Sequence, residues 1–470
     1  MRQRRNVILQ RVEIVDSAAE GRSVAKVDGK AVFIEKTVPG DVVDVKLTKI
    51  KKDWAEGYPL HFHSYSTERV EPFFQHFGVC GGCKWQMLPY ERQLTYKQQQ
   101  VYETLKRIGK IKLPDLLPIA GAEETKFYRN KLEYTFSTKE FTPQPPTGLP
   151  LEQKGVLGFH PQGFFDKVVD IDKCWLQPEP TNTLRNIIRT FAQRNNFSFY
   201  NQREHRGLLR TMQVRICTTG EIMVNIVFGE NDKQKQEQLL SFIKREFPQI
   251  TALLYTINSK WNDSLNDLEP VTYSGNGYVI ERLEDFEFKI GPKSFFQTNT
   301  KQAERLYRIT REFAELNGSS IVYDLYCGTG SIGIFCSKKT KKIIGIESLD
   351  AAVRDAKENA ALNNIGHALF FTGDVVDICN HQFLEVQGKP DVLITDPPRA
   401  GMHEKLVKRI LEIEAPVIVY VSCNPATQAR DLNLLDAKYE VAKVQPVDMF
   451  PHTHHIENVV QLRIKTKRIS

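Results

Sequence analysis

The C-terminal part of the chain alternates almost uninterrupted apolar runs with segments of helical periodicity. Helical spacing is clearest at Leu306, Ile309 and Phe313. The apolar runs are residues 321–326, 341–348, 368–374, 391–396, 416–422 and 459–464. Strands without polar alternation are buried on both faces, and intervening helices supply the cover. The pattern therefore predicts a parallel sheet with helices on both sides, whose ligand lies beyond the carboxyl ends of the strands.

The preceding residues carry two other patterns. Residues 1–62 alternate apolar and polar residues in short runs, separated by turn dipeptides such as Asp28-Gly29, and predict a small β-barrel. Residues 63–285 mix helical and strand-like periodicities and predict an α+β domain. We therefore expect a multidomain chain in which residues 286–470 form the α/β domain.

Charge and cysteine content narrow the class of protein. Lys and Arg outnumber Asp and Glu by 64 to 57, which favours a polyanionic partner without requiring one. No apolar run approaches the roughly 18 residues of a membrane span. Gln10, Arg11 and Glu13 interrupt the first apolar stretch before it could act as an export signal. The eight sparse cysteines then favour thiols or metal ligands over disulfides, and we expect a cytoplasmic protein.

The first two strands of the α/β domain end in residues that suit a nucleoside cofactor. The first runs into Tyr326, Gly328 and Gly330, where glycines let a ligand approach the backbone closely. The second ends in Glu347, about 20 residues further on, where a carboxylate binds ribose hydroxyls in nucleotide-binding sheets. The turn lacks the third glycine of a dinucleotide site. A surface carboxylate is the alternative for Glu347.

Two later strands and the segment before the last one carry a thiol and two carboxylates. Cys423 directly follows the run 416–422, Asp396 is the last residue of the run 391–396, and Glu457 precedes the final run. A thiol in this position can add to an electron-poor double bond, and a carboxylate opposite can remove a proton from the adduct. A buried structural cysteine is the alternative for Cys423.

Five motifs in order carry a resemblance to a known family. They are SFFQTN at 294–299, DLYCGTG at 324–330, DPPRAG at 396–401, VSCNP at 421–425 and DMFPHTHHIE at 448–457. Together they resemble the RNA uracil-5 methyltransferase family. Residues 1–62 resemble the TRAM domain, an RNA-binding oligonucleotide-fold barrel. The resemblance implies a TRAM barrel, a central α+β domain and a C-terminal Rossmann-like class I methyltransferase domain.

The resemblance also implies roles for individual residues. Cys423 would be the nucleophile that adds to C6 of uracil, and Glu457 would take the C5 proton. S-adenosylmethionine would be the cofactor, and Phe295 would face the uracil ring, with a core position as its alternative. The implied cofactor-binding residues are Gln297, Tyr326, Gly328, Gly330, Glu347 and Asp396.

The expected partner is RNA in a single-stranded or remodelled form, because a stacked uracil admits neither a thiol nor a methyl donor. A TRAM barrel followed by a cysteine motif is typical of the branch that acts on 23S ribosomal RNA. Transfer RNA is the alternative substrate, and a non-catalytic RNA-binding or folding factor is the alternative function. We expect a monomer without membrane association.

A second cysteine group resembles an iron-sulfur motif that is one ligand short. Cys80, Cys83 and Cys174 match three of the four cysteines that bind a 4Fe-4S cluster in part of the family. Phe74 occupies the position of the remaining cysteine. A cluster normally takes four thiolates, so a 4Fe-4S cluster, no metal, or a zinc ion with His76 all remain open.

Overall fold

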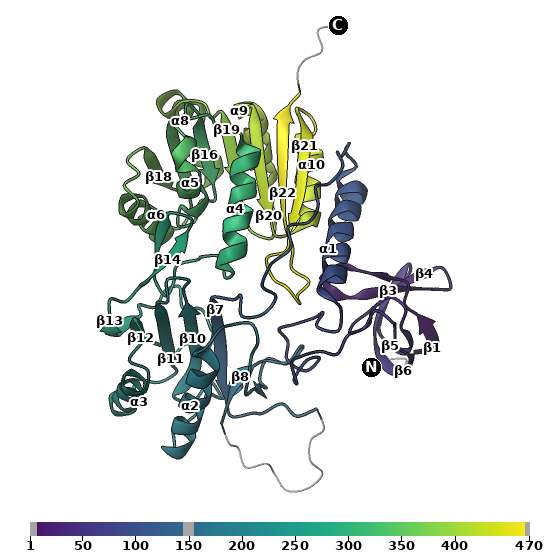
Figure 1. Ribbon diagram of the computed structural model, residues 1–470, viewed down its shortest axis with the longest axis vertical. Coiled ribbons are helices and arrows are strands. Elements are labelled where there is room, and N and C mark those ends of the chain that lie inside the picture. The colour runs from purple at the N-terminus through teal and green to yellow at the C-terminus, as the bar shows by residue number, and fades with distance from the viewer. Residues whose placement is uncertain (1–6, 144–154, 466–470) are drawn as a thin grey trace.

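The computed structural model describes residues 7–143 and 155–465, and it contains three sheet-based units (Figure 1). The N-terminal barrel is a six-stranded sheet in the order β1-β5-β6-β4-β3-β2. Its strands are β1 (Ile8–Glu13), β2 (Asp16–Ser17), β3 (Ser23–Val27), β4 (Lys30–Ile34), β5 (Val42–Ile50) and β6 (Trp54–Ser64). Asp28 and Gly29 both have positive φ and close the predicted hairpin between β3 and β4.

The central unit is a seven-stranded sheet in the order β13-β12-β11-β10-β7-β8-β9. Its strands are β7 (Lys131–Ser137), β8 (Val156–Phe159), β9 (Val169–Asp170), β10 (Leu209–Ile216), β11 (Ile222–Phe228), β12 (Ala252–Ile257) and β13 (Val271–Gly275). Helices α2 (Thr181–Arg194) and α3 (Lys233–Glu246) share one hydrophobic core with the sheet. Phe191 and Phe242 stack between the two helices, with ring centroids 3.8 Å apart.

The C-terminal unit is a seven-stranded sheet in the order β18-β17-β16-β19-β20-β22-β21. Its strands are β16 (Ile321–Leu325), β17 (Lys342–Glu347), β18 (Ala368–Thr372), β19 (Val392–Thr395), β20 (Val417–Ser422), β21 (Tyr439–Val447) and β22 (Glu457–Ile464). The first five in chain order are parallel, as predicted. The last strand, β22, is antiparallel to both of its neighbours. Strand β21 was not predicted, because Glu440, Lys443 and Gln445 interrupt its apolar pattern.

Helices cover both faces of this sheet, which confirms the α/β prediction. Val392 and Ile394 belong to one core and Leu393 to the other. One face is covered by α4 (Thr300–Ala314), α5 (Ser331–Cys336) and α6 (Asp350–Leu362). The other is covered by α7 (Val375–Ile378), α8 (His381–Gln387), α9 (Glu404–Ile413) and α10 (Pro425–Leu435). Short 3-10 segments, η1 (Ala19–Gly21) and η3 (Ser337–Lys339), complete these units.

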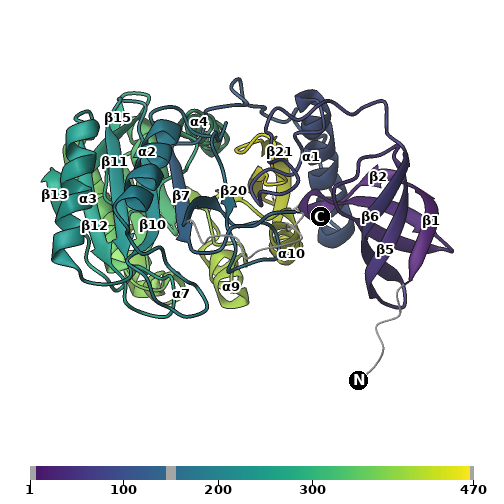
Figure 2. The same cartoon turned by 90° about the horizontal axis from the view of Figure 1, so that it is seen from below.

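One helix with its extension, and a hairpin that begins before residue 286, also lie against the C-terminal sheet. Helix α1 (Tyr90–Thr104) and the turn η2 (Leu105–Gly109) place Val101 and Leu105 in its core. Figure 2 shows α1 between the barrel and the C-terminal unit. The hairpin β14 (Val279–Leu283) and β15 (Phe286–Ile290) packs on the opposite face. Within the described residues, no helix is long and apolar enough to cross a membrane.

Candidate active site

The predicted nucleophile and base lie opposite each other because β22 runs against β20. Ser422 pairs with Asn458 at the last registered position of the two strands. The next residues outward, Cys423 and Glu457, therefore face each other at the carboxyl edge of the sheet. Asp396 follows β19, the other neighbour of β20, and lies at the same edge. The structure thus brings together all three predicted side chains.

The glycine turn and Glu347 meet at the adjoining part of this edge. The Gly328 N–H donates to Glu347 Oε2 at 3.2 Å, and the Leu349 N–H donates to Oε1 at 2.9 Å. Glu347 is therefore held against the turn rather than free on the surface. Tyr326 has φ 61°, a left-handed conformation that is uncommon for a residue with a Cβ atom. A Cβ on Gly330 would lie 3.0 Å from Phe370, so only glycine fits there.

Buried carboxyl groups gather beneath this edge. Burial, together with repulsion from neighbouring carboxylates, raises the pKa of Asp324 to about 7. Burial raises the pKa of Asp396 to about 7, and burial and Asp396 raise the pKa of Glu457 well above its usual range. Asp324 Oδ1 is buried without a hydrogen-bond partner. A ligand that carries positive charge would complete this group, and S-adenosylmethionine carries both a sulfonium and an ammonium.

The Cys423 thiol is neutral in the free protein. Burial is the main cause that raises its pKa to about 11, and Glu457 and Asp396 raise it further. The guanidinium of Arg399 acts in the opposite direction but does not compensate. Cys423 is only half-buried, so a reagent can reach it. The site therefore holds a thiol that needs added positive charge to become a thiolate.

Alkylation of Cys423 should reveal this raised pKa. Only the thiolate reacts, so we expect the rate to rise about tenfold per pH unit from about pH 7 to 9.5, below the pKa. Iodoacetamide labelling followed by mass spectrometry of the Cys423 peptide measures the rate, with Cys423→Ala as the blank. A rate that levels off near about pH 8.5, as for an unperturbed thiol, would contradict the electrostatics described here.

The loops after β19 and β20 are joined by residues to which the sequence analysis assigned no role. Asn424 Nδ2 donates to the Arg399 carbonyl at 3.0 Å, while Asn424 Oδ1 accepts from the Ala426 N–H and caps α10. Arg399 Nη2 lies 3.2 Å from His455 Nδ1. Arg399 and Asn424 both lie within the family motifs, so the motifs could have indicated a role for them. These two residues fix the geometry of the loops around the thiol.

In the SFFQTN segment, the first phenylalanine is exposed to solvent and the second is buried. Phe295 is 72% exposed, whereas Phe296 is 3% exposed and lies in the core. A core position for Phe295 is therefore wrong, and its ring is available to a ligand. The Gln297 carbonyl accepts from Asn130 Nδ2 at 2.9 Å, which ties this segment to the central unit.

The segment 448–456, which leads into Glu457, is held by side chains from distant parts of the chain. Lys97 Nζ donates to Asp448 Oδ1 at 2.6 Å, and Tyr90 Oη donates to Asp448 Oδ2 at 2.8 Å. Tyr128 Oη donates to the carbonyl of Pro451 at 3.0 Å. Lys97 and Tyr90 lie on α1, so this helix helps to position the loop beside the site.

The three histidines of this segment are neutral. Burial lowers the pKa of His452, His454 and His455 to about 4 each. Across residues 7–143 and 155–465, no three His, Cys, Asp or Glu side chains are grouped so that they could hold a metal ion. The histidines are thus neutral, partly or fully buried groups of the loop that leads into Glu457.

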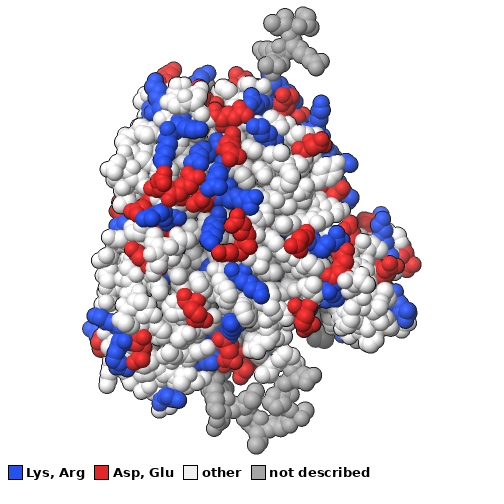
Figure 3. Space-filling model, viewed as in Figure 1, with Lys and Arg blue, Asp and Glu red and all other residues white. Residues whose placement is uncertain are grey.

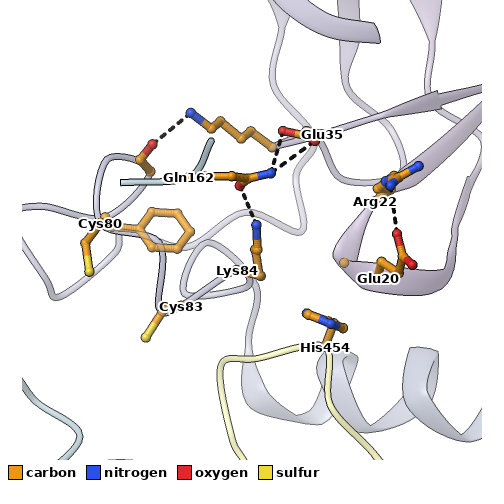
Figure 4. A pocket seen from close by; sticks show the side chains of 12 residues that line it. Glu20, Arg22, Glu35, Cys80, Cys83, Lys84, Gln162 and His454 are labelled. Atoms are coloured by element: carbon orange, nitrogen blue, oxygen red, sulfur yellow. Dashed lines mark hydrogen bonds and ion pairs between the residues drawn. The ribbon is translucent and has the colours of Figure 1, made fainter. Parts of the chain in front are cut away.

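The second cysteine group does not supply the ligands of a 4Fe-4S cluster. Cys80, Cys83 and Cys174 line one cavity of about 650 Å³. Cys80 and Cys83 also line a second cavity of about 240 Å³, and Figure 4 shows them on the side of it away from Glu20 and Arg22. Burial raises the pKa of the Cys80 thiol to about 11 and that of Cys83 to about 12. Phe74 is buried in the hydrophobic core at the position of the missing ligand. Three thiols beside a phenylalanine do not supply the four thiolates that such a cluster normally takes.

A mostly parallel sheet with one antiparallel strand, a glycine turn, an acidic second strand and buried carboxyl groups at its carboxyl edge is typical of a class I methyltransferase. Two family models match the chain: tRNA (Uracil-5-)-methyltransferase over residues 276–465 and the TRAM domain over residues 3–60. The chain belongs to the RNA uracil-5 methyltransferase family and is an S-adenosylmethionine-dependent RNA methyltransferase.

Relatives and a solved structure agree over nearly the whole chain. An uncharacterized RNA methyltransferase of Bacteroides thetaiotaomicron is 51% identical over 95% of this chain and 100% of its own length. One of Porphyromonas gingivalis is 47% identical over 96% of this chain and 99% of its own. The structure of Pyrococcus abyssi tRNA (uracil-54, C5)-methyltransferase with S-adenosyl-L-homocysteine is 28% identical, with a TM-score of 0.75. It covers 96% of this chain and 100% of its own.

Proposed function

We propose that this enzyme methylates C5 of a uridine in 23S ribosomal RNA through a covalent adduct with Cys423. The observation that carries the proposal is the register of β20 and β22, which sets the thiol opposite Glu457. A thiol and a carboxyl group across one gap suit addition to C6 and proton removal from C5 of the same ring. A non-catalytic RNA-binding factor would not need this pairing.

The proposed reaction balances as follows. The Cys423 thiolate bonds to C6, and the electron pair of the C5–C6 double bond moves toward C5 and O4. S-adenosylmethionine supplies an electrophilic methyl group to C5 and leaves as S-adenosylhomocysteine with the electron pair of the broken bond. The Glu457 carboxylate takes the C5 proton, the double bond re-forms and the thiolate is expelled.

In this proposal, charge links the reactivity of Cys423 to binding of the methyl donor. Burial raises the pKa of both Cys423 and Glu457, which disfavours the thiolate and the carboxylate while no cofactor is bound. A cationic ligand among Asp324, Asp396 and Glu457 favours the ionised forms of all neighbouring acids. We therefore expect the Cys423 thiolate and the Glu457 carboxylate to form together, when the methyl donor binds.

We further propose roles for the other residues at this edge. Glu347 binds the ribose, and the open turn of Tyr326 admits the cofactor beside it. The exposed Phe295 ring stacks on the target uracil. The proposed cofactor site comprises Gln297, Tyr326, Gly328, Gly330, Glu347 and Asp396.

The domain division is also a proposal. We propose a barrel at residues 1–62, a central domain that begins at residue 63 and a C-terminal methyltransferase domain that extends to residue 470. We place the hairpin β14–β15 with the last, because its apolar side chains enter that core and the family model begins at residue 276. Helix α1 belongs with the central part by sequence and with the methyltransferase part by packing.

Transfer RNA is a second candidate substrate. The family model and the Pyrococcus abyssi enzyme are both named for transfer RNA, which favours this candidate. Ribosomal RNA is preferred because the barrel followed by a cysteine motif resembles that branch. A bound 4Fe-4S cluster has no part in the proposed reaction, because the three thiols present do not fit it.

Mapping of 5-methyluridine decides between the two RNAs. We expect purified enzyme to methylate unmodified 23S ribosomal RNA at one or a few uridines, and unmodified transfer RNA not at all. Nuclease digestion and mass spectrometry of both RNAs, with the Cys423→Ala variant as the blank, give the answer. If 5-methyluridine is found only in transfer RNA, transfer RNA replaces ribosomal RNA as the assigned substrate. If 5-methyluridine is found in neither RNA, the proposed function is overturned.

A further inference from the structure

Three aromatic side chains from separate segments meet on the surface of the central unit. The ring centroid of Trp175 lies 5.8 Å from that of Phe73 and 5.5 Å from that of Phe127. Phe127 is 37% exposed, and Phe73 and Trp175 are half-buried. Aromatic rings that are grouped together and partly exposed to solvent suit a planar ligand.

Two lysines complete this group. Lys126 Nζ lies 4.1 Å from the ring centroid of Phe73, and Lys173 Nζ lies 3.8 Å from that of Trp175. Within the described part of the chain, neither lysine forms an ion pair with an acidic side chain. Two ammonium groups therefore lie over the rings of an aromatic surface, a combination that suits a planar group joined to an anion.

The backbone that presents Phe127 is strained. Phe127 has φ 57°, a left-handed conformation that residues with a Cβ atom rarely adopt. Its N–H donates to the Trp175 carbonyl at 2.7 Å, and the Arg129 N–H donates to the Leu176 carbonyl at 2.8 Å. These bonds hold the strained residue beside Trp175. Strain that keeps an apolar ring in solvent is more readily explained by ligand binding than by folding.

Trp175 also lines a cavity that extends to the loop carrying His455. Trp175 lines a cavity of about 650 Å³ together with Arg129, Lys131 and His455. His455 contacts Arg399, whose charge acts on the thiol of the proposed nucleophile. The volume lies within the range of ligand sites in proteins. A nucleotide bound at Trp175 would therefore share this cavity with His455.

The face of the molecule seen in Figure 3 does not show a basic track. On the face seen in Figure 3, basic and acidic side chains are interspersed rather than gathered by sign. That face therefore lacks the continuous basic track by which proteins bind duplex phosphates without base contacts. The cluster of Phe73, Phe127 and Trp175 instead suits RNA binding in which unpaired bases stack on aromatic rings.

We propose that Phe73, Lys126, Phe127, Lys173 and Trp175 form a stacking site for the unpaired bases that adjoin the target uridine. In the free protein the two ammonium groups lie over ring faces. A nucleotide would place its base on a ring and draw an ammonium to its phosphate, which exchanges one favourable contact for two. The assignment rests on the proposed function, since it supposes that the target is a uridine in unpaired RNA.

Binding of oligouridylate tests the stacking site without methyl transfer. The probe is a fluorescent oligouridylate of about twelve nucleotides, and the protein carries Cys423→Ala so that no adduct forms. We expect Trp175→Ala and Phe127→Ala each to weaken binding roughly tenfold, as loss of one stacked base does. Trp261→Ala, which removes a ring that is 80% exposed and stacked on His205, is the matched control and leaves affinity unchanged.

A second probe separates stacking from charge. An abasic ribose-phosphate oligomer of equal length should bind Trp175→Ala and the parent equally, because it has no base to stack. Lys126→Gln and Lys173→Gln should weaken binding of both probes and reduce the salt dependence. Trp175→Phe keeps a ring and should retain most of the affinity, which excludes misfolding as the cause.

Two results would overturn the stacking site. One is oligouridylate affinity that survives both alanine variants, and the other is an equal loss for the abasic oligomer. Neither depends on product formation. Failure of the parent enzyme to make 5-methyluridine would refute the proposed function and leave the binding comparison intact.

Discussion

Replacement of Cys423 by alanine should lower the rate of RNA methylation by at least about four orders of magnitude, because the covalent route loses its nucleophile. RNA binding should be retained, since the thiol lies at a loop end and takes no part in the core. Transfer of a labelled methyl group to RNA measures the rate, and fluorescence anisotropy measures binding. Cys379→Ala removes a fully buried thiol elsewhere and serves as the control.

Glu457→Gln should have a different consequence. The thiol can still add and the methyl group can still transfer, but the C5 proton has no acceptor, so the enzyme remains bonded to RNA. Denaturing electrophoresis should show a slower band that contains protein and RNA and disappears in the Cys423→Ala, Glu457→Gln double variant. Normal turnover by either single variant would refute the assigned roles.

Replacement of Lys97 by methionine should lower the free energy of unfolding by about 3–5 kcal/mol, the effect of removing one partner of a buried ion pair. The side chains of Lys97 and Asp448 are both fully buried, so the variant leaves an uncompensated carboxylate inside the protein. Urea unfolding followed by circular dichroism measures the change. The variant should also lower the turnover rate, because Asp448 begins the segment that leads into Glu457.

Two further variants test this interpretation. Arg107→Met breaks an exposed pair with Glu103 at the end of the same helix, and should change stability by no more than about 0.5 kcal/mol. The double variant Lys97→Met, Asp448→Asn should be more stable than Lys97→Met, because no unpaired charge is left. A loss below about 1 kcal/mol for Lys97→Met would show that water reaches the pair.

The fold was largely predictable because its signals are local. The apolar runs 321–326, 391–396 and 416–422 became three parallel strands, since uninterrupted apolar strands need cover on both faces. The barrel hairpin followed from Asp28-Gly29, which favours positive φ. Strand β21 escaped prediction because charged residues on a less buried strand hide its period.

The position of α1 could not be predicted in the same way. Its helical pattern shows that one face is buried but does not say against which partner. The structure shows that Val101 and Leu105 of α1 and its extension enter the core of the methyltransferase sheet. Packing of distant segments depends on complementary shape and charge, as the buried pair of Lys97 and Asp448 illustrates.

For the candidate site, the strand ends indicated Glu347, and the resemblance carried by the five motifs selected Cys423, Glu457 and Asp396, because such motifs are continuous stretches of sequence. The facing of Cys423 and Glu457 required the antiparallel register of β20 and β22, a pairing of residues 34 positions apart. The raised pKa of Cys423 and the contact of Arg399 with His455 likewise depend on burial and distance, which only the packed chain defines. A linear sequence records which groups are present, whereas their electrostatic environment arises from tertiary packing that removes water and sets neighbouring charges close together.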